Sequence, residues 1–249
     1  MLSNILLFTF LASIVSLFLV AILLLNKTLI HKTSFLLVSF AAGALLATGF
    51  MDTLKEAVSI AGSDAFLWTT ISFAMFFLIE RLFISLHRHT EDDHLDDSEE
   101  LRVPTPFLVF GDGLHNFIDG MSIAAAFLVS FQLGLVTSIA VFVHEIPHEL
   151  GDFGILIHKG WSRGGVLVIN ALTGAVSILG AIVAFYLGKQ FENIIPILLS
   201  VTTANFIYLS ATGLLPEIHH KAKKSFAVKY TLSFFAGILL MVTLIRVLG

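Results

Sequence analysis

The chain has 249 residues, of which 57% are hydrophobic and 13% charged. In soluble domains roughly a quarter of the residues are charged. The low charged fraction and high hydrophobic fraction of this chain therefore exclude an ordinary soluble protein and indicate a membrane protein. The formal net charge of -4 argues against a nucleic-acid partner. The chain has no cysteine, so any metal site must use nitrogen and oxygen ligands rather than thiolates.

Hydrophobic runs long enough to cross a bilayer recur along the chain. A hydrocarbon core of about 30 Å needs roughly 20 apolar residues in a helix, and every backbone polar group must be paired within the span. The connections are too short for the strands of a barrel, so the sequence predicts an all-α, polytopic membrane protein with one transmembrane domain over 1–249. The eight predicted helices lie near 4–25, 34–54, 63–86, 105–129, 133–157, 164–187, 193–215 and 227–248.

The distribution of basic residues predicts the orientation, because short cytoplasmic loops are enriched in Lys and Arg. If the N-terminus lies outside, the cytoplasmic connections hold Lys27, Lys32, Arg88, Arg102, Lys159, Arg163, Lys221, Lys223, Lys224 and Lys229. The outer side then holds only Lys55, Lys189 and Arg246. Both termini are therefore expected outside, with the first run retained as a helix rather than cleaved as a signal peptide. The expected location is a plasma membrane, the inner membrane if the source is prokaryotic.

One hydrophilic stretch, His87 to Pro104, interrupts the hydrophobic pattern between the third and fourth predicted helices. Its charge and lack of aromatic residues favour a solvated, disordered cytoplasmic loop. The alternative is weak capture of divalent cations, as His-rich tracts can provide. The residues that would do so are His87, His89, His94, Asp92, Asp93, Asp96 and Asp97.

A short string recurs in two predicted helices that cross the membrane in opposite directions. Ala-Thr-Gly occurs at 47–49 and again at 211–213, followed in each case by apolar residues and a glutamate. This recurrence is what an inverted-topology repeat predicts, as in many secondary transporters. The alternative is chance, because packed membrane helices favour small residues at their interfaces.

Ionisable residues gather in the fourth and fifth predicted helices, which are expected to be antiparallel neighbours. At about 1.5 Å per residue, His115 lies about 15 Å from the cytoplasmic edge and His148 roughly 14 Å from the same edge. Residues four apart share one helix face, so each helix presents its polar groups as a stripe. The two stripes consist of Asp112, His115, Asn116 and Asp119, and of His144, Glu145, His148, Glu149 and Asp152.

Carboxylates at this depth require an explanation. Each charged carboxylate at the centre of a membrane helix raises the free energy of insertion by about 2.5–3.5 kcal/mol. The five acids together would therefore raise it by more than about 10 kcal/mol. Neither helix carries a Lys or Arg that could neutralise them. A bound divalent cation can do so, and imidazole with carboxylate suits Zn²⁺ first, with Fe²⁺, Mn²⁺, Co²⁺ and Cd²⁺ as alternatives.

Two strings carry a family resemblance: HNFIDG from His115 to Gly120 and HEIPHELGDF from His144 to Phe153. They resemble the motifs of the ZIP (Zrt/Irt-like) family of divalent-metal transporters. The resemblance implies eight helices with an inverted repeat and a metal centre on the fourth and fifth helices that can hold two ions. It also implies movement of metal toward the cytoplasm, in some members by an elevator-type sliding of the transport helices.

Carried over residue by residue, the resemblance implies two adjacent metal positions. One would use His115, His144 and His148, and the other Asn116, Asp119 and Glu145, while Glu149 and Asp152 match the motif without an assigned role. Other branches carry a bridging glutamate where this chain has His148. A neutral imidazole cannot bridge two ions as a carboxylate does, so two equally tight positions are not expected. The sequence leaves open whether the chain forms a homodimer.

Two other classes of function compete with transport. His144 to His148 also spells HExxH, in which two His bind zinc and the Glu activates water in metalloproteases. However, Pro147 stands inside the motif, and an Asp-Gly pair lies upstream of it rather than downstream. The other alternative is a membrane protein that senses the ion without passing it. The sequence favours a transporter that is not an enzyme.

Ligation by histidine predicts a response to acid. Protonated imidazole cannot bind a metal, and an ordinary His protonates near pH 6.5, so metal binding and uptake should fall as the pH decreases. We expect uptake into vesicles to decrease between about pH 8 and about pH 5. Uptake that is unchanged over this interval would contradict ligation by His115, His144 and His148.

Overall fold

The computed structural model describes residues 1–25, 27–88, 105–216, 218 and 227–248. Residues 89–104 and the side chain of His87 lie outside the described part, so the predicted cation-capturing loop stays a prediction. The described elements are α1 (Leu2–Phe10), η1 (Leu11–Val15), α2 (Ser16–Leu23), α3 (Lys27–Thr48), η2 (Gly49–Thr53), α4 (Leu54–Ala61), α5 (Asp64–Arg88), α7 (Thr105–Val129), α8 (Phe131–His158), α9 (Arg163–Gln190), η3 (Glu192–Ile194), α10 (Ile195–Tyr208), η4 (Leu209–Leu214) and α12 (Ala227–Leu248).

These elements confirm the all-α prediction for the described part of the chain. Six of its helical segments are long and apolar enough to cross a membrane: Leu2–Leu23, Thr33–Ala61, Asp64–Leu82, Arg163–Gln190, Glu192–Leu214 and Ala227–Leu248. Helices α7 and α8 are also long, with 25 and 28 residues, and they carry the predicted polar stripes. Those polar residues lower the mean hydropathy of both helices.

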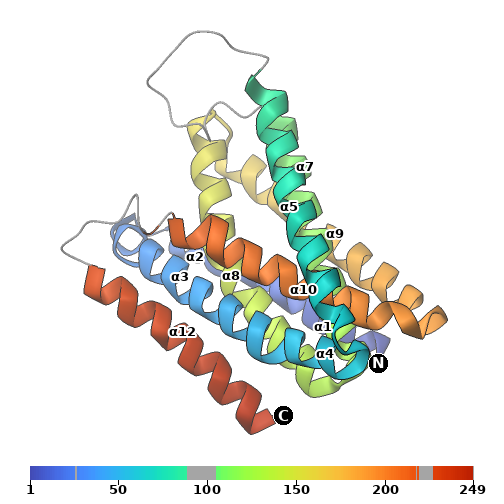
Figure 1. Cartoon of the computed structure of the whole chain (residues 1–249). Helices are drawn as coiled ribbons and strands as arrows, with labels where there is room; N and C mark the ends of the chain where they lie inside the picture. Colours follow the sequence, from blue (N-terminus) through green and yellow to red (C-terminus); the bar gives the residue numbers. More distant parts are fainter. Residues whose placement is uncertain (26, 89–104, 217, 219–226, 249) are drawn as a thin grey trace.

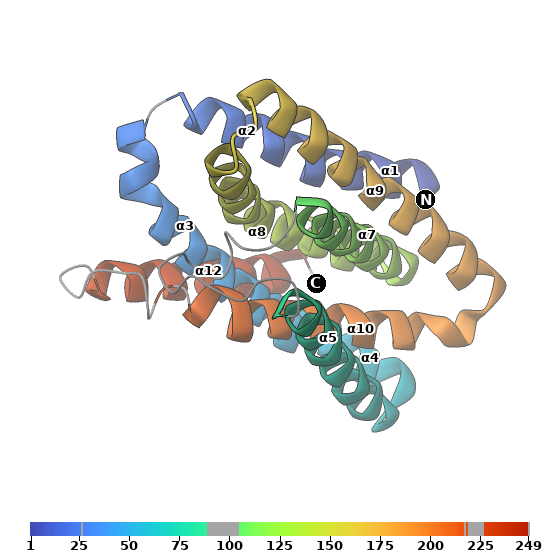
Figure 2. The same ribbon diagram turned by 90° about the horizontal axis from the view of Figure 1, so that it is seen from above.

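Helices α7 and α8 occupy the centre of the bundle. Seen from above, α1, α2 and α9 lie along one side of this pair, and α3, α10 and α12 lie along the other (Figure 2). The most extensive packing is between α7 and α9, followed by that between α3 and α12. In Figure 1 the start of α7 and the end of α8 lie together at the top, which confirms that the two helices are antiparallel neighbours.

Glycines bring two pairs of helices into close contact. A Cβ atom on Gly120 of α7 would overlap the carbonyl oxygen of Ser177 on α9, and one on Gly180 of α9 would overlap the carbonyl oxygen of Phe117. The pair α3 and α12 is built in the same way, with Gly43 against Phe234. Small residues allow membrane helices to approach until their backbones touch, and van der Waals packing then holds them together.

Both segments that carry the Ala-Thr-Gly string contain π-helical turns, η2 after α3 and η4 after α10. In both strings the threonine hydroxyl donates to a carbonyl four residues earlier, from Thr48 to Ala44 at 3.0 Å and from Thr212 to Tyr208 at 2.8 Å. The same local chemistry therefore recurs at both places. It is consistent with the predicted inverted repeat, which stays a prediction.

The close approach of α7 and α9 predicts how glycine substitutions act. Gly120→Ala should destabilise the protein by about 1–3 kcal/mol, because its methyl group would overlap the backbone of α9. The matched control is Gly111→Ala on the same helix, where an added Cβ meets nothing within 4 Å. This control should be neutral or stabilising by up to about 1 kcal/mol, since Ala favours helix over Gly. Thermal unfolding in detergent checks this, and equal midpoints for the two variants would contradict it.

Candidate metal centre

Helices α7 and α8 hold their polar stripes against each other because the turn between them is short. Ser130 is the one residue that separates them, so the connection is shorter than the interval between the predicted helices, which end near 129 and begin near 133. The hydroxyl of Ser130 accepts a hydrogen bond from the backbone N–H of Leu133 at 3.1 Å, which caps α8. The tight turn brings residues at equal depth on the two helices into contact.

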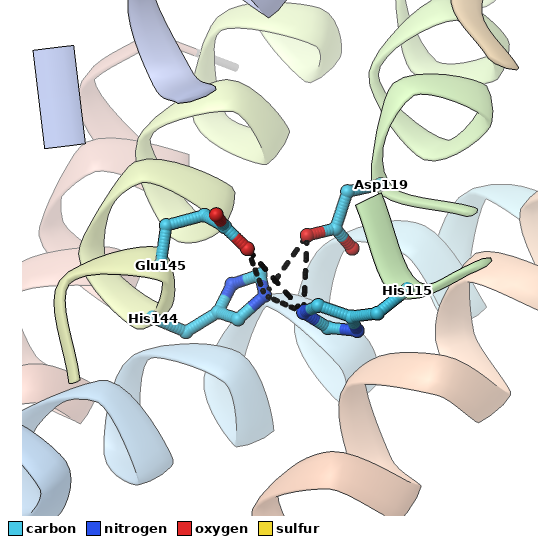
Figure 3. A group of neighbouring side chains, drawn as sticks. All are labelled: His115, Asp119, His144 and Glu145. Atoms are coloured by element: carbon cyan, nitrogen blue, oxygen red, sulfur yellow. Dashed lines mark hydrogen bonds and ion pairs between the residues drawn. The ribbon is translucent and has the colours of Figure 1, made fainter. Parts of the chain in front are cut away.

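Four predicted ligands meet between these helices: His115 and Asp119 from α7, and His144 and Glu145 from α8 (Figure 3). We call them the first cluster. One ligand atom from each residue lies within 4.8 Å of all the others. The Nε2 atom of His144 is 3.0 Å from Asp119 Oδ2 and 3.2 Å from His115 Nε2. The Nε2 atom of His115 is 3.3 Å from Glu145 Oε1.

Three members of the first cluster are buried and His115 is partly buried, and three of the four carboxylate oxygens lack a hydrogen-bond partner among the described residues. His144 is 1% exposed and Glu145 is 0% exposed. Within the described residues, neither oxygen of Glu145 nor Oδ2 of Asp119 has a hydrogen-bond partner. Carboxylate oxygens without donors are costly inside a protein, and a bound cation satisfies them.

The ring of His144 is oriented for ligation. Its Nδ1 atom lies 3.1 Å from the carbonyl oxygen of Ala140, one turn earlier on α8. A metal-binding histidine typically donates its second ring N–H to a carbonyl or carboxylate, which fixes the tautomer and directs the other nitrogen to the metal. Here this arrangement directs Nε2 into the first cluster, toward Asp119 and His115.

Three more residues form a second cluster, beside the first: Asp112, His148 and Asp152. The Nδ1 atom of His148 lies 3.5 Å from Asp152 Oδ2 and 3.8 Å from Asp112 Oδ1. The structure therefore groups His148 with two aspartates, whereas the resemblance implies a position shared with His115 and His144. The two clusters adjoin each other, because the rings of His148 and His115 stack with their centroids 4.5 Å apart.

The remaining predicted ligands, Asn116 and Glu149, have other partners. The amide nitrogen of Asn116 donates to Asp112 Oδ1 at 2.8 Å, and Oε2 of Glu149 accepts from Asn170 of α9 at 2.6 Å. Both residues are buried, and each keeps one oxygen, Oδ1 of Asn116 and Oε1 of Glu149, without a hydrogen-bond partner among the described residues. They border the clusters without joining either set of converging ligand atoms.

Two asparagines on neighbouring helices were not predicted from the sequence. Asn205 of α10 donates to Asp119 Oδ1 at 3.3 Å, and Asn170 of α9 holds Glu149 as described above. Each is a buried amide within an otherwise apolar helix. Polar side chains at such depth are a signal in the sequence, but nothing in the helical pattern indicates which residue they contact.

The first cluster therefore offers two imidazole nitrogens and two carboxylates. Their formal charges would balance one divalent cation, and the set matches the nitrogen and oxygen ligands that zinc and related metals accept. No Lys or Arg occurs in α7 or α8 to serve as an internal counter-charge. The fold and the site together define a helical membrane protein with a group of side chains at the centre of its bundle that could hold a divalent metal.

The chain belongs to the ZIP family: the family model described as ZIP Zinc transporter matches residues 85–245, which is more than half of the chain. This match includes α7 and α8 with both clusters. It confirms the resemblance carried by the two motifs. ZIP proteins are transporters rather than enzymes, so the alternative of a metalloprotease built on the HExxH string is not retained.

Individual relatives are also named zinc transporters. Over 145 residues the chain is 40% identical to Zinc transporter foi of Drosophila melanogaster, covering 57% of this chain and 20% of that protein. It is 36% identical over 136 residues to human Zinc transporter ZIP6, covering 54% of this chain and 18% of that protein. Human Zinc transporter ZIP4 is 42% identical over 121 residues, covering 49% of this chain and 18% of that protein. The similarity thus spans about a fifth of each relative's length.

The hydrogen bond from Asn205 to Asp119 predicts a positioning role for that amide. Asn205→Ala should weaken zinc binding by about 10–100-fold, the usual cost of removing a group that orients a metal ligand. Asn193→Ala, at an exposed site in η3, is the matched control and should bind zinc as the parent does. Competition with a chromophoric zinc chelator measures both affinities. Equal affinity in the two variants would show that Asn205 does not position the ligand.

Proposed function

We propose that this protein moves divalent transition-metal ions, first of all Zn²⁺, across a membrane toward the cytoplasm. The observation that carries the proposal is the buried first cluster of His115, Asp119, His144 and Glu145. The relatives reported above are named zinc transporters, which supports zinc as the substrate. Fe²⁺, Mn²⁺, Co²⁺ and Cd²⁺ accept the same kinds of ligand and are the competing substrates to test.

The proposed topology has eight membrane helices, because α7 and α8 join the six apolar spans. At about 1.5 Å per residue, both are long enough to cross a core of about 30 Å. The position of the chain ends supports an even number of crossings, since both ends lie low in Figure 1, opposite the start of α7. The excess of Lys and Arg in the connections assigned to the cytoplasm supports termini on the outer side of a plasma membrane.

In the proposed mechanism an ion enters from outside, sheds its water and binds at the first cluster. Imidazole nitrogens and carboxylate oxygens replace the lost water, and the two carboxylates offset the charge of the ion where the surroundings are apolar. Because binding must be reversible, the site has to become exposed to the opposite side. We propose that α7 and α9, held together at Gly120 and Gly180, move as one body against α3 and α12.

Uptake into proteoliposomes that enclose a zinc-sensitive dye tests this function. His144→Ala removes an imidazole at the centre of the first cluster and should lower zinc uptake by roughly 100-fold or more, beyond the cost of losing a supporting group. His158→Ala is the matched control, because His158 lies exposed at the end of α8, outside both clusters. This control should transport zinc at the parent rate.

Two results would contradict the proposal. A parent chain that binds zinc tightly yet admits none to the vesicles would instead be a metal sensor. Equal zinc uptake by the parent and by His144→Ala would show that the first cluster does not lie on the transport path of the ion. Repeating the assay with Fe²⁺, Mn²⁺, Co²⁺ and Cd²⁺ ranks the substrates.

A further inference from the structure

The second cluster lies closer than the first to the end of the bundle where α7 begins and α8 ends. Asp112 precedes His115 by three residues on α7, and His148 follows His144 by four on α8, so both are displaced in the same direction along the antiparallel pair. Three or four residues correspond to about one helical turn, roughly 5 Å. The first cluster and the second cluster are therefore successive positions along one line between α7 and α8.

The second cluster has unsatisfied ligand atoms of its own. Nδ1 of His148 and Oδ2 of Asp152 are buried atoms without a hydrogen-bond partner within the described chain. The two atoms are 3.5 Å apart, and Asp112 Oδ1 is 3.8 Å from the same nitrogen. One imidazole nitrogen and two carboxylate oxygens thus converge with the chemistry that a divalent transition metal requires.

A small cavity opens beside these ligands, lined by Asp112 and Asp152 together with Asn170 of α9. The Asn170 amide also holds Glu149, which is 2% exposed and whose Oε1 atom has no hydrogen-bond partner among the residues described. Asn170 thus connects the lining of the cavity to a further buried carboxylate, and neither α7 nor α8 carries a Lys or Arg. The two carboxyl groups that line the cavity, Asp112 and Asp152, supply oxygen ligands that suit a cation.

The two clusters differ in their access to water. In the second cluster the side chains of His148 and Asp152 are 30% and 20% exposed and that of Asp112 is 8% exposed. In the first cluster the side chains of Asp119, His144 and Glu145 are 1% exposed and that of His115 is 10% exposed. An ion at the second cluster would keep more of its water and exchange more rapidly. The stacked rings of His115 and His148 connect the two positions, so an ion leaving the first cluster meets the second within about one helical turn.

We propose that Asp112, His148 and Asp152 form a second binding site for the same divalent cations, through which the ion passes after leaving the first cluster. This site is distinct from the adjacent position that the family resemblance implies, which uses Asn116, Asp119 and Glu145. Its place in the transport path rests on the proposed function. Its ability to bind a metal does not.

The stoichiometry of zinc binding tests the site, measured by equilibrium dialysis of the full chain in lipid nanodiscs against Zn²⁺. The parent should bind two ions per chain, and Asp152→Asn should bind one, because the amide keeps the shape of the side chain and removes its charge. His144→Ala should lose the other ion and keep this one. Asp64→Asn, at an exposed position at the start of α5, is the matched control and should retain both ions.

Asp152→Glu provides a second check, since it retains the carboxylate and should therefore retain the second ion. Monodisperse particles verify that every variant is folded. If Asp152→Asn still binds two ions, or if the parent binds a single ion that Asp152→Asn leaves unchanged, the second site is wrong and the transport function stands. If two ions bind but no zinc enters proteoliposomes, the transport function is wrong and the second site stands.

Discussion

The fold of this protein is organised around buried carboxyl groups on two helices that carry no Lys or Arg. Asp119 and Glu145 lie at the centre of the bundle, on helices that contain no Lys or Arg. Holding several carboxylates in apolar surroundings would cost more than about 10 kcal/mol if they stayed charged and uncompensated. A bound divalent cation would offset this free-energy cost, and the cost would return once the ion left. The same constraint supports the proposal that the first cluster binds a divalent metal.

The surrounding helices support this centre in two ways. Backbone contact at Gly120 and Gly180 holds α7 against α9, so the ligands of α7 are carried on a rigid pair of helices. Amide groups from outside the central pair then hold the carboxylates, with Asn205 donating to Asp119 and Asn170 donating to Glu149. Ligand geometry in a metal site depends on such outer partners as much as on the ligands themselves.

The two clusters give the central helix pair a gradient of burial. His144 is buried, with its ring Nδ1 atom against the carbonyl of Ala140, whereas His148 lies one turn away with part of its side chain exposed. A transported ion must be bound well enough to shed its water and weakly enough to leave. In the proposed mechanism, adjacent sites of decreasing burial would meet both requirements, because water would replace protein ligands progressively along the line.

Much of this protein could be read from its residue pattern: the all-α membrane class, the antiparallel pairing of α7 and α8, and the shared depth of His115 and His148. Helical periodicity and span length fix these features, since both are local properties of the chain. The grouping of His148 with Asp112 and Asp152, and the support from Asn205, came only from the folded arrangement. These contacts depend on how each helix is rotated and how closely its neighbours approach, and packing between distant segments sets both quantities.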